Sequence, residues 1–276
     1  MEKSFEIRFP VESDYENLKA LWQTVFDDTK ESLDYFFRNT ISPERVLVVF
    51  DGSVPVSTLY MLESDILNDG KSYSAYYIYA VCTHPDYRGK GLMKKLFQEL
   101  FEIAKSRSID YLFLVPEEEY LFGIYEKLGF KKGFAYYEEC AFKKDFQNKT
   151  KINKTEKLAY ENYRNAIEQN SKNIPVAVLK ESTFNSFFNS VSGEVKTAFI
   201  ENEGYAIYEE KDNKLTVFEL FGNEKVLLSK VFENTEKEEI ALRKIAKENS
   251  VPYGMYYKLN DAPEIRNGFF GIPYAT

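Results

Sequence analysis

The sequence has few of the residues that build metal centres and disulfide frameworks. Its 276 residues include two cysteines, Cys82 and Cys140, and one histidine, His84. Both cysteines lie in apolar runs with strand character, so we expect buried, reduced thiols. These three side chains are too few for the usual structural zinc sites. The sequence therefore predicts no bound metal and no disulfide framework.

Positive charge and long apolar runs are also scarce. The chain has 36 Lys and Arg against 44 Asp and Glu, a net charge of -8, which argues against nucleic-acid and anionic membrane partners. No run of about 18 apolar residues occurs, so no membrane span is predicted. The N-terminal residues lack the apolar core of a signal peptide. We therefore expect a cytoplasmic protein, whose acidity weakly favours a cationic substrate such as an amine.

Aromatic side chains, in contrast, are abundant. The chain carries 21 Tyr and 23 Phe, and apolar residues make up 44% of the sequence. Aromatic rings mainly serve core packing, although some can line a ligand cavity. A length of 276 residues is long for one domain and comfortable for two. The composition therefore indicates two globular domains with aromatic-rich cores.

The first half of the chain alternates between strand and helix patterns. Apolar periodicity predicts helices at residues 14–26, 91–105 and 117–128, and a short helix that holds Leu33, Phe36 and Phe37. Alternating or continuous apolar runs predict strands at residues 5–9, 45–50, 54–62, 76–82, 111–115, 130–134 and 137–142. Residues 1–142 are therefore predicted to form an α/β (α+β) domain.

A polar, lysine-rich stretch at residues 143–157 is predicted to be a linker to a second domain, residues 158–276. The pattern of apolar residues in this second domain is weaker than in the first. We expect a helix at 183–188, a helix at 236–247, and strands at 195–200, 204–208, 215–221 and 251–259. The order strand, strand, strand, helix, strand repeats that of the first half. No glycine-rich basic loop precedes the predicted helix, so a second pyrophosphate site is not expected there.

A glycine-rich loop joins an apolar strand to an amphipathic helix in the first half. It reads Tyr87-Arg88-Gly89-Lys90-Gly91-Leu92-Met93. The glycine pair lets the backbone approach a ligand and point N–H groups at it, and the helix start adds free donors. Four of the eight residues at 88–95 are basic and none is acidic. The loop therefore predicts a phosphate site; a tight turn with solvated lysines is the alternative.

The residues around this loop resemble a known family. Val81-Cys82-Thr83-His84-Pro85-Asp86-Tyr87-Arg88-Gly89-Lys90-Gly91, then a helix, a strand and Tyr125-Glu126-Lys127-Leu128-Gly129-Phe130, is similar to the GNAT superfamily of acyl-CoA-dependent N-acetyltransferases. The resemblance spans about residues 1–142 by element order. Asp86 departs from the Gln or Arg often found there, a frequent variation with little bearing on binding. The resemblance implies a GNAT-like mixed central sheet flanked by helices.

The resemblance also implies a site for acetyl-CoA. Loop backbone amides hold the CoA pyrophosphate in the family, and the positions that match are Arg88, Gly89, Lys90, Gly91, Leu92 and Met93. The strand before the loop pairs with the pantetheine arm, and the matching positions are Val81, Cys82 and Thr83. A backbone N–H near Val81 would polarise the thioester oxygen.

One tyrosine is implicated in the chemistry. The family's tyrosine in the helix before Gly-Phe stands near the CoA sulfur and protonates the leaving thiolate, and here it is Tyr125. This residue shares a helical face with Leu121 and Leu128, so a core ring is the alternative reading. Both can hold, because a tyrosine can bury its ring and still offer its hydroxyl as a proton donor.

The general base is not identifiable from the sequence. A neutral amine must attack, so a carboxylate or a water chain has to remove its proton. Some family members place a Glu on the strand before the loop, but residues 73–79 contain no acid. The weak candidates, each read by default as a solvated acid at a turn, are Glu63, Asp65 and Glu117–Glu119.

Two other side chains near the loop are not expected to react. His84 precedes Pro85, which favours an extended conformation at the loop entrance, so we do not expect it to act as a base. Cys82 has no activating base nearby in the sequence, so packing is favoured over a role as an acyl-carrying nucleophile.

These features predict an acyl-CoA-dependent N-acetyltransferase that acts on a primary amine of a small molecule or peptide. The two-domain layout is similar to tandem acetyltransferases of the enhanced-intracellular-survival type, with a degenerate second GNAT-like half that shapes the acceptor cleft. The alternative is a non-catalytic acyl-CoA-binding sensor or regulatory module. An aminoacyl-tRNA-dependent transferase is disfavoured because the acidic chain offers no RNA-binding face.

Overall fold

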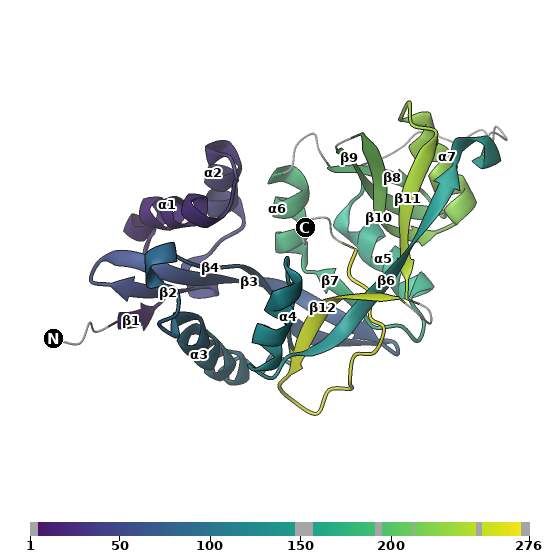
Figure 1. Cartoon of the computed structure of the whole chain (residues 1–276). Helices are drawn as coiled ribbons and strands as arrows, with labels where there is room; N and C mark the ends of the chain where they lie inside the picture. The colour runs from purple at the N-terminus through teal and green to yellow at the C-terminus, as the bar shows by residue number, and fades with distance from the viewer. Residues whose placement is uncertain (1–4, 147–156, 191–194, 212, 247–249, 272–276) are drawn as a thin grey trace.

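One mixed β-sheet runs through both halves of the chain (Figure 1). The structure is a computed structural model that describes residues 5–146, 157–190, 195–211, 213–246 and 250–271. Within them, twelve strands form the sheet in the order β1-β2-β3-β4-β5-β12-β6-β11-β10-β9-β8, with β7 paired to β3. Helices cover the sheet, so the predicted α+β class is confirmed.

The first half contains every element that the sequence patterns predict. They are β1 (Phe5–Arg8), α1 (Tyr15–Val25), α2 (Lys30–Asn39), β2 (Val46–Asp51), β3 (Val54–Asn68), β4 (Lys71–Thr83), α3 (Leu92–Ser106), β5 (Tyr111–Leu114), α4 (Glu119–Glu126) and β6 (Lys131–Phe142). One detail differs: the strands predicted at 130–134 and 137–142 are the single strand β6. It stays continuous because it passes from one partner, β12, to another, β11.

The second half has more elements than predicted. They are α5 (Tyr160–Asn170), β7 (Val176–Leu179), α6 (Glu181–Ser190), β8 (Val195–Ile200), β9 (Gly204–Lys211), β10 (Lys214–Gly222), α7 (Glu224–Glu233), β11 (Glu239–Ile245) and β12 (Val251–Lys258). Most of the predicted linker lies outside the described residues, and its first part, Lys143–Phe146, forms a short 3-10 turn against α7.

The helix predicted at 236–247 is wrong. Residues Glu239–Ile245 form strand β11, and the helix of this half is α7, which lies before that stretch. Ile240 and Leu242 are two positions apart, which suits one face of a strand. Strand β11 lies between β6 and β10. Its conformation therefore depends on backbone hydrogen bonds along both of its edges, and local propensity alone does not determine it.

The two halves repeat the same order of elements. In the first, the antiparallel strands β2, β3 and β4 lead through α3 to β5, which is parallel to β4. In the second, the antiparallel strands β8, β9 and β10 lead through α7 to β11, which is parallel to β10. The second half is therefore a degenerate copy of the same fold.

The halves exchange their last strands. Strand β12, from the end of the chain, lies antiparallel beside β5 of the first half. Strand β6 lies antiparallel beside β11 of the second half, and β6 and β12 pair with each other along the seam. The predicted boundary at residue 142 coincides with the end of β6, yet the sheet is continuous across the junction.

Helices pack on both faces of the sheet (Figure 1). On one face, α1, α2, α5 and α6 cover an aromatic core in which Trp22 contacts the rings of Phe36, Phe37, Tyr60 and Tyr79. On the other face, α3 and α4 cover a second core, and α7 covers a third beside β8–β11. Many aromatic residues therefore serve core packing.

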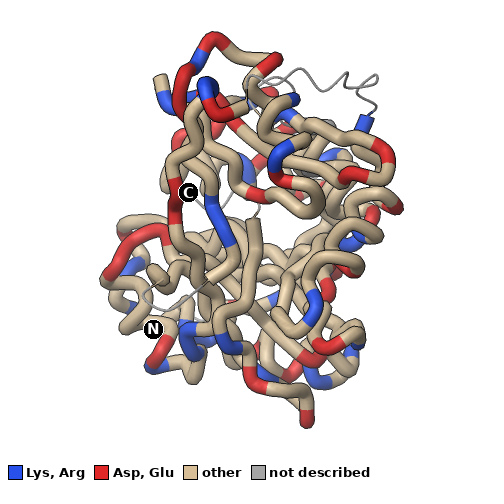
Figure 2. Tube along the Cα trace, turned by 90° about the vertical axis from the view of Figure 1, so that its right-hand side faces the viewer, with Lys and Arg blue, Asp and Glu red and all other residues tan. Residues whose placement is uncertain are grey.

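In the described part of the chain, no helix is long and apolar enough to cross a membrane. The same residues contain no group of three or more His, Cys, Asp or Glu that could hold a metal ion. Acidic and basic residues are interspersed on the side shown in Figure 2.

A fully buried carboxyl group lies in the core of the second half. Glu219 of β10 accepts hydrogen bonds from the Tyr205 hydroxyl and from the backbone N–H of Gly271, the latter at 3.1 Å. Burial raises the pKa of Glu219 from 4.5 to about 7, against the effect of the Tyr205 hydrogen bond. This carboxyl group holds the segment that follows β12 against β10.

Glu219 should make stability fall as the pH rises. Its pKa is higher in the folded than in the unfolded chain, so its contribution is complete below about pH 4.5 and is lost as the pH rises through about 7. We expect wild type to lose about 3 kcal/mol more unfolding free energy than Glu219→Gln between pH 4.5 and pH 8. Urea unfolding across this range measures the difference, and parallel pH profiles for the two proteins would contradict the assignment.

Candidate active site

Strands β4 and β5 separate at their C-terminal ends. They pair in parallel only where Ala75, Tyr76 and Tyr77 face Tyr111, Leu112 and Phe113. Strand β5 ends at Leu114, whereas β4 continues to Thr83. In the described structure, no strand pairs with the β5-facing edge of residues 78–83. This edge offers backbone N–H and C=O groups to an extended ligand.

A β-bulge helps to turn β4 away from β5. Tyr79 faces Tyr60 and Cys82 faces Thr58, so two residues of β4, Ala80 and Val81, oppose one residue of β3. Ala80 has a φ of +45°, a conformation that costs strain in any residue except glycine. A bulge bends its strand and re-aims local backbone groups. Sequence reasoning missed Ala80, because alanine gives no signal for a positive φ.

The glycine loop lies between β4 and α3, with both glycines in the left-handed region. Gly89 has φ +75° and Gly91, the N-cap of α3, has φ +71°. A Cβ built at either position would meet nothing within 4 Å. Within the described residues, the N–H groups of Gly89, Lys90 and Gly91 have no hydrogen-bond acceptor. The loop therefore has the open space and free donors of an anion cradle.

The side chains of the loop hold its shape. Arg88 donates from Nε to the carbonyl of Thr83 at 3.3 Å. Lys90 donates from Nζ to the carbonyl of Asp86 at 2.9 Å and lies 4.4 Å from the centre of the Tyr87 ring. These basic side chains bend back on the loop and bring positive charge to it.

In the first turn of α3, some side chains face the core and others face solvent. Leu92 is buried against the sheet and Met93 is half-buried in the same core, whereas Lys94 and Lys95 are exposed. Leu92 and Met93 thus anchor the helix, while the backbone N–H groups of its first turn point toward the loop end.

Tyr125 reaches the site from α4. Its ring packs at 5.7 Å from that of Phe97 and 5.9 Å from that of Phe130, and the residue is 6% exposed. Among the residues described, its hydroxyl has no hydrogen-bond partner, and it lies close enough to Tyr77 to affect the pKa of that residue. Burial raises the pKa of Tyr125, so the phenol stays protonated at neutral pH. The ring is a core ring and its hydroxyl is a free proton donor.

The two cysteines differ in their surroundings. Cys82 is buried, and burial raises the pKa of its thiol to about 12. It therefore stays a protonated thiol and does not act as a nucleophile. Cys140 is exposed, which corrects the prediction that both thiols are buried. Its side chain lies outward on β6 between Glu139 and Ala141, where strand alternation places one face toward solvent.

His84 has a local structural role. Its Nδ1 accepts a hydrogen bond from the backbone N–H of Asp86 at 3.3 Å, and it caps the short 3-10 turn at Pro85–Tyr87. The Tyr87 hydroxyl then donates to Asp51 at 2.8 Å. The histidine and tyrosine thus tie the loop to the β2–β3 hairpin.

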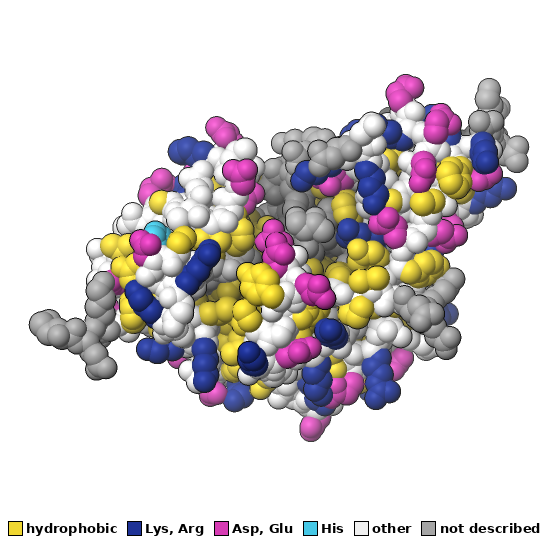
Figure 3. All heavy atoms as spheres, in the orientation of Figure 1, with side chains coloured by type: hydrophobic (Ala, Val, Ile, Leu, Met, Phe, Trp, Pro, Cys, Tyr) yellow, Lys and Arg dark blue, Asp and Glu magenta, His cyan; other side chains and the backbone are white. Residues whose placement is uncertain are grey.

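Two of the candidate bases are already paired. Glu63 binds Arg45 at 2.7 Å, and Asp65 binds Arg164 at 2.8 Å. Glu117–Glu119 are exposed at the start of α4. Acidic and apolar side chains gather in the middle of the face in Figure 3, over the α4 region. The carboxylates of Glu117–Glu119 are therefore more exposed than those of Glu63 and Asp65.

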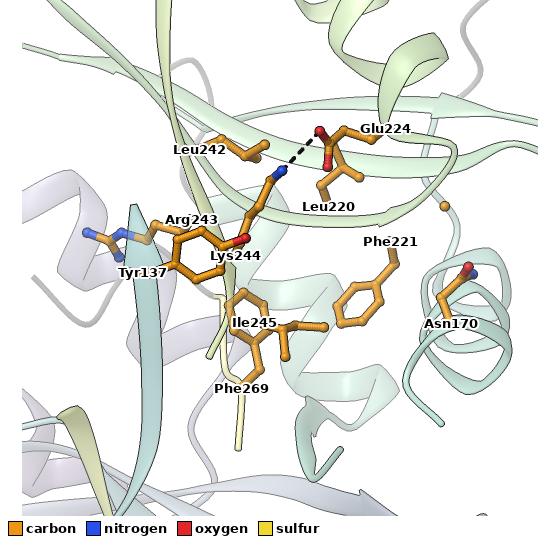
Figure 4. A pocket seen from close by; sticks show the side chains of 11 residues that line it. Tyr137, Asn170, Leu220, Phe221, Glu224, Leu242, Arg243, Lys244, Ile245 and Phe269 are labelled. Carbon is orange, nitrogen blue, oxygen red and sulfur yellow. Dashed lines mark hydrogen bonds and ion pairs between the residues drawn. The ribbon is translucent and has the colours of Figure 1, made fainter. Parts of the chain in front are cut away.

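The second half repeats the strand separation without the glycine loop. Strands β10 and β11 pair only at two positions and then diverge, and β10 also has an irregular register with β9. A cavity of about 310 Å³ lies in the gap (Figure 4). There Lys244 pairs with Glu139 at 2.7 Å and Glu224 at 3.1 Å, so its charge is neutralised. The side chain of Asn223 caps α7 by accepting from the N–H of Val226.

Comparison with known proteins finds a family match in the first half and a shared fold over most of the chain. Residues 6–133 match a family described as acetyltransferase (GNAT) domain. No curated protein matches the chain. Solved structures with a similar fold include a GCN5-related N-acetyltransferase from Kribbella flavida, at 14% identity and a TM-score of 0.74, over 93% of this chain and 72% of that one.

Two further structures extend the likeness. Eis1 from Mycobacterium abscessus has 12% identity and a TM-score of 0.67, over 93% of this chain and 74% of that one. A putative acetyltransferase from Pyrococcus horikoshii has 16% identity and a TM-score of 0.59, over 100% of this chain and 96% of that one. At these identities the likeness establishes the shared fold, which extends beyond residue 133 into the second half.

Proposed function

Because residues 6–133 are a GNAT acetyltransferase domain, we propose that the chain is an N-acetyltransferase that moves an acetyl group from acetyl-CoA to a primary amine. The acceptor would be a small molecule or a peptide. One observation supports the proposal: the edge of β4 beyond its pairing with β5 is open and leads into the glycine loop, and Tyr125 of α4 lies close enough to Tyr77 of β4 to affect its pKa.

The residues around the gap fit acetyl-CoA. The open space over Gly89 and Gly91 and their free N–H groups suit the pyrophosphate. The unpaired edge of β4 at Val81, Cys82 and Thr83 suits the amide groups of the pantetheine arm. When bound, acetyl-CoA would supply a thioester as the acetyl donor.

Tyr125 would act as the general acid, because it stays protonated at neutral pH and its hydroxyl is free to donate. A backbone N–H at the bulge near Val81 would stabilise negative charge that develops on the acyl oxygen. Deprotonation of the amine is left to a carboxylate of α4 or to water, since Glu63 and Asp65 are paired.

A non-catalytic acyl-CoA sensor is the second candidate. The absence of an acid at residues 73–79 favours it, because that strand supplies the base in some GNAT enzymes. In either case the second half would shape the cleft beyond the gap, and its paired Lys244 and capped α7 offer no second pyrophosphate cradle. We also keep the expectation of a cytoplasmic protein without a nucleic-acid partner.

Release of CoA thiol distinguishes the two candidates. The full chain would be incubated with acetyl-CoA and a panel of polyamines, aminoglycosides, amino acids and peptides, and thiol release would be followed with a chromogenic disulfide. An enzyme should release thiol with at least one acceptor in excess of hydrolysis. Tight binding of acetyl-CoA by calorimetry, without release for any acceptor, would support the sensor instead.

A further inference from the structure

A cavity lies at the junction of the two halves, beside α4. Its volume is about 630 Å³, within the range of small-molecule sites. The end of β5 and one side of α4 form one wall, and β6, β11 and β12 form the rest. Tyr125 is next to Glu126, one of the lining residues on α4. The cavity is therefore built by the strand exchange and adjoins the helix that supplies the proposed acid.

Arg243 of β11 lies in the cavity wall opposite α4, and its guanidinium group packs against two aromatic rings. Its guanidinium carbon is 4.7 Å from the ring centre of Tyr136 and 4.7 Å from that of Phe218. Figure 4 shows its side chain pointing away from Phe221 and Phe269, the floor of the smaller cavity. With two rings packed against it, the guanidinium offers its edge of N–H donors to a further group.

The donors of Arg243 are not all satisfied. Its Nε is buried and has no hydrogen-bond partner, and the side chain forms no ion pair with any residue described. In contrast, Arg8, Arg45 and Arg164 each bind a carboxylate within the fold. A buried donor without an acceptor requires an explanation, because it costs stability. A carboxylate in the cavity would bind the terminal N–H groups of Arg243, because the enclosed Nε is not accessible from the cavity.

Charge is distributed unevenly across the cavity. On the α4 wall, Glu117, Glu119 and Glu126 are acidic and exposed. Arg243 lines the cavity from β11, whereas Lys132 of β6 lies over the ring of Phe122 on α4, 5.1 Å from its centre. A ligand with an ammonium group at one end and a carboxylate at the other would match both walls. Its amine would then face α4, the helix that also carries the proposed acid.

We propose that Arg243 binds the carboxylate of the acceptor, and that the acceptors are amines that carry a carboxylate, such as amino acids or short peptides. The inference rests on the proposed acetyl transfer and names the acceptor class for the same site. Arg243 is a specificity residue in it, and takes no part in proton transfer.

Matched acceptors test this assignment. The full chain would be assayed with acetyl-CoA and pairs of dipeptides that differ only in a free C-terminal carboxylate or its amide. We expect wild type to favour the carboxylate by at least about tenfold in kcat/KM, the scale of a charged hydrogen-bonded pair. Arg243→Gln should remove the preference mainly through KM, while the amide acceptors keep their rates. Arg243→Lys should retain part of it, because charge without the planar fork gives a weaker contact.

Arg107→Gln is the matched control, because Arg107 also stacks on a ring, Phe9, at 5.6 Å, but lies outside the cavity. It should leave the preference unchanged. Equal rates for both acceptors in wild type, or an equal loss for both in a folded Arg243→Gln, would overturn the inference. If the protein acetylates amines without a carboxylate as well as those with one, this inference fails and the proposed acetyl transfer stands. If no amine causes thiol release, the proposed acetyl transfer fails and this inference fails with it.

Discussion

Replacing Tyr125 with phenylalanine should lower kcat by about a hundredfold or more, the usual contribution of a positioned general acid. The KM for acetyl-CoA and the stability should change little, because the ring keeps its contacts with Phe97 and Phe130. The hydroxyl has no hydrogen-bond partner within the described residues, so its loss breaks no contact there. Steady-state kinetics of thiol release measure the effect.

The pH profile adds an independent check on Tyr125. Burial raises the pKa of its phenol, so the acid form persists at higher pH than an ordinary tyrosine. In wild type, kcat should therefore show no loss of a tyrosine proton up to about pH 10. Tyr77→Phe is the control, because it removes a hydroxyl group from a buried tyrosine that is near Tyr125 but lies on β4. Equal kcat in wild type and Tyr125→Phe would rule out the role as general acid.

Replacing Gly91 with alanine should weaken CoA binding by about tenfold, and the double change with Gly89→Ala by about a hundredfold. A Cβ at φ +71° strains the backbone and occupies the open space over the loop. Both effects move the N–H groups that would bind the pyrophosphate. Calorimetric titration with CoA measures the affinity directly, and works whether or not the protein is an enzyme.

Gly70→Ala is a close control for this prediction. Gly70 has φ +72° and also meets nothing within 4 Å, but it lies in the turn between β3 and β4, at the far end of β4 from the loop. Gly70→Ala and Gly91→Ala should therefore lose similar unfolding free energy, about 1 kcal/mol, and only Gly91→Ala should lose affinity. Equal CoA affinity in both variants would contradict a pyrophosphate site at the loop.

Local patterns were enough to locate the loop and Tyr125. The glycine pair between a strand and a helix determines a backbone shape over seven residues, and that shape is present with both glycines at positive φ. Tyr125 could be singled out because the residues from Tyr125 to Phe130 resemble the GNAT pattern, whereas helical spacing by itself indicated only a ring on the inner face of α4. Their roles in binding and catalysis stay predictions that the variants above test.

The second half was harder to predict because its elements depend on distant partners. Strand β11 was taken for a helix, since neither its neighbour β6 nor its neighbour β10 is adjacent to it in sequence. Strand β7 was missed because its four residues gain stability by pairing with β3, more than a hundred positions earlier. Cys140 was expected to be buried, yet it is exposed, while its neighbour Ala141 on the opposite face of β6 packs against the third core.

The sequence by itself determined the parts of this protein that a few consecutive residues encode: the backbone of the glycine loop and the strand–helix order of the first half. The tertiary structure alone decided the bulge at Ala80, the exchange of β6 and β12, and the cavity where Arg243 faces the acids of α4. These features arise from backbone pairing and side-chain packing between segments far apart in the chain. Such contacts depend on how whole strands meet in space, and no local pattern records that.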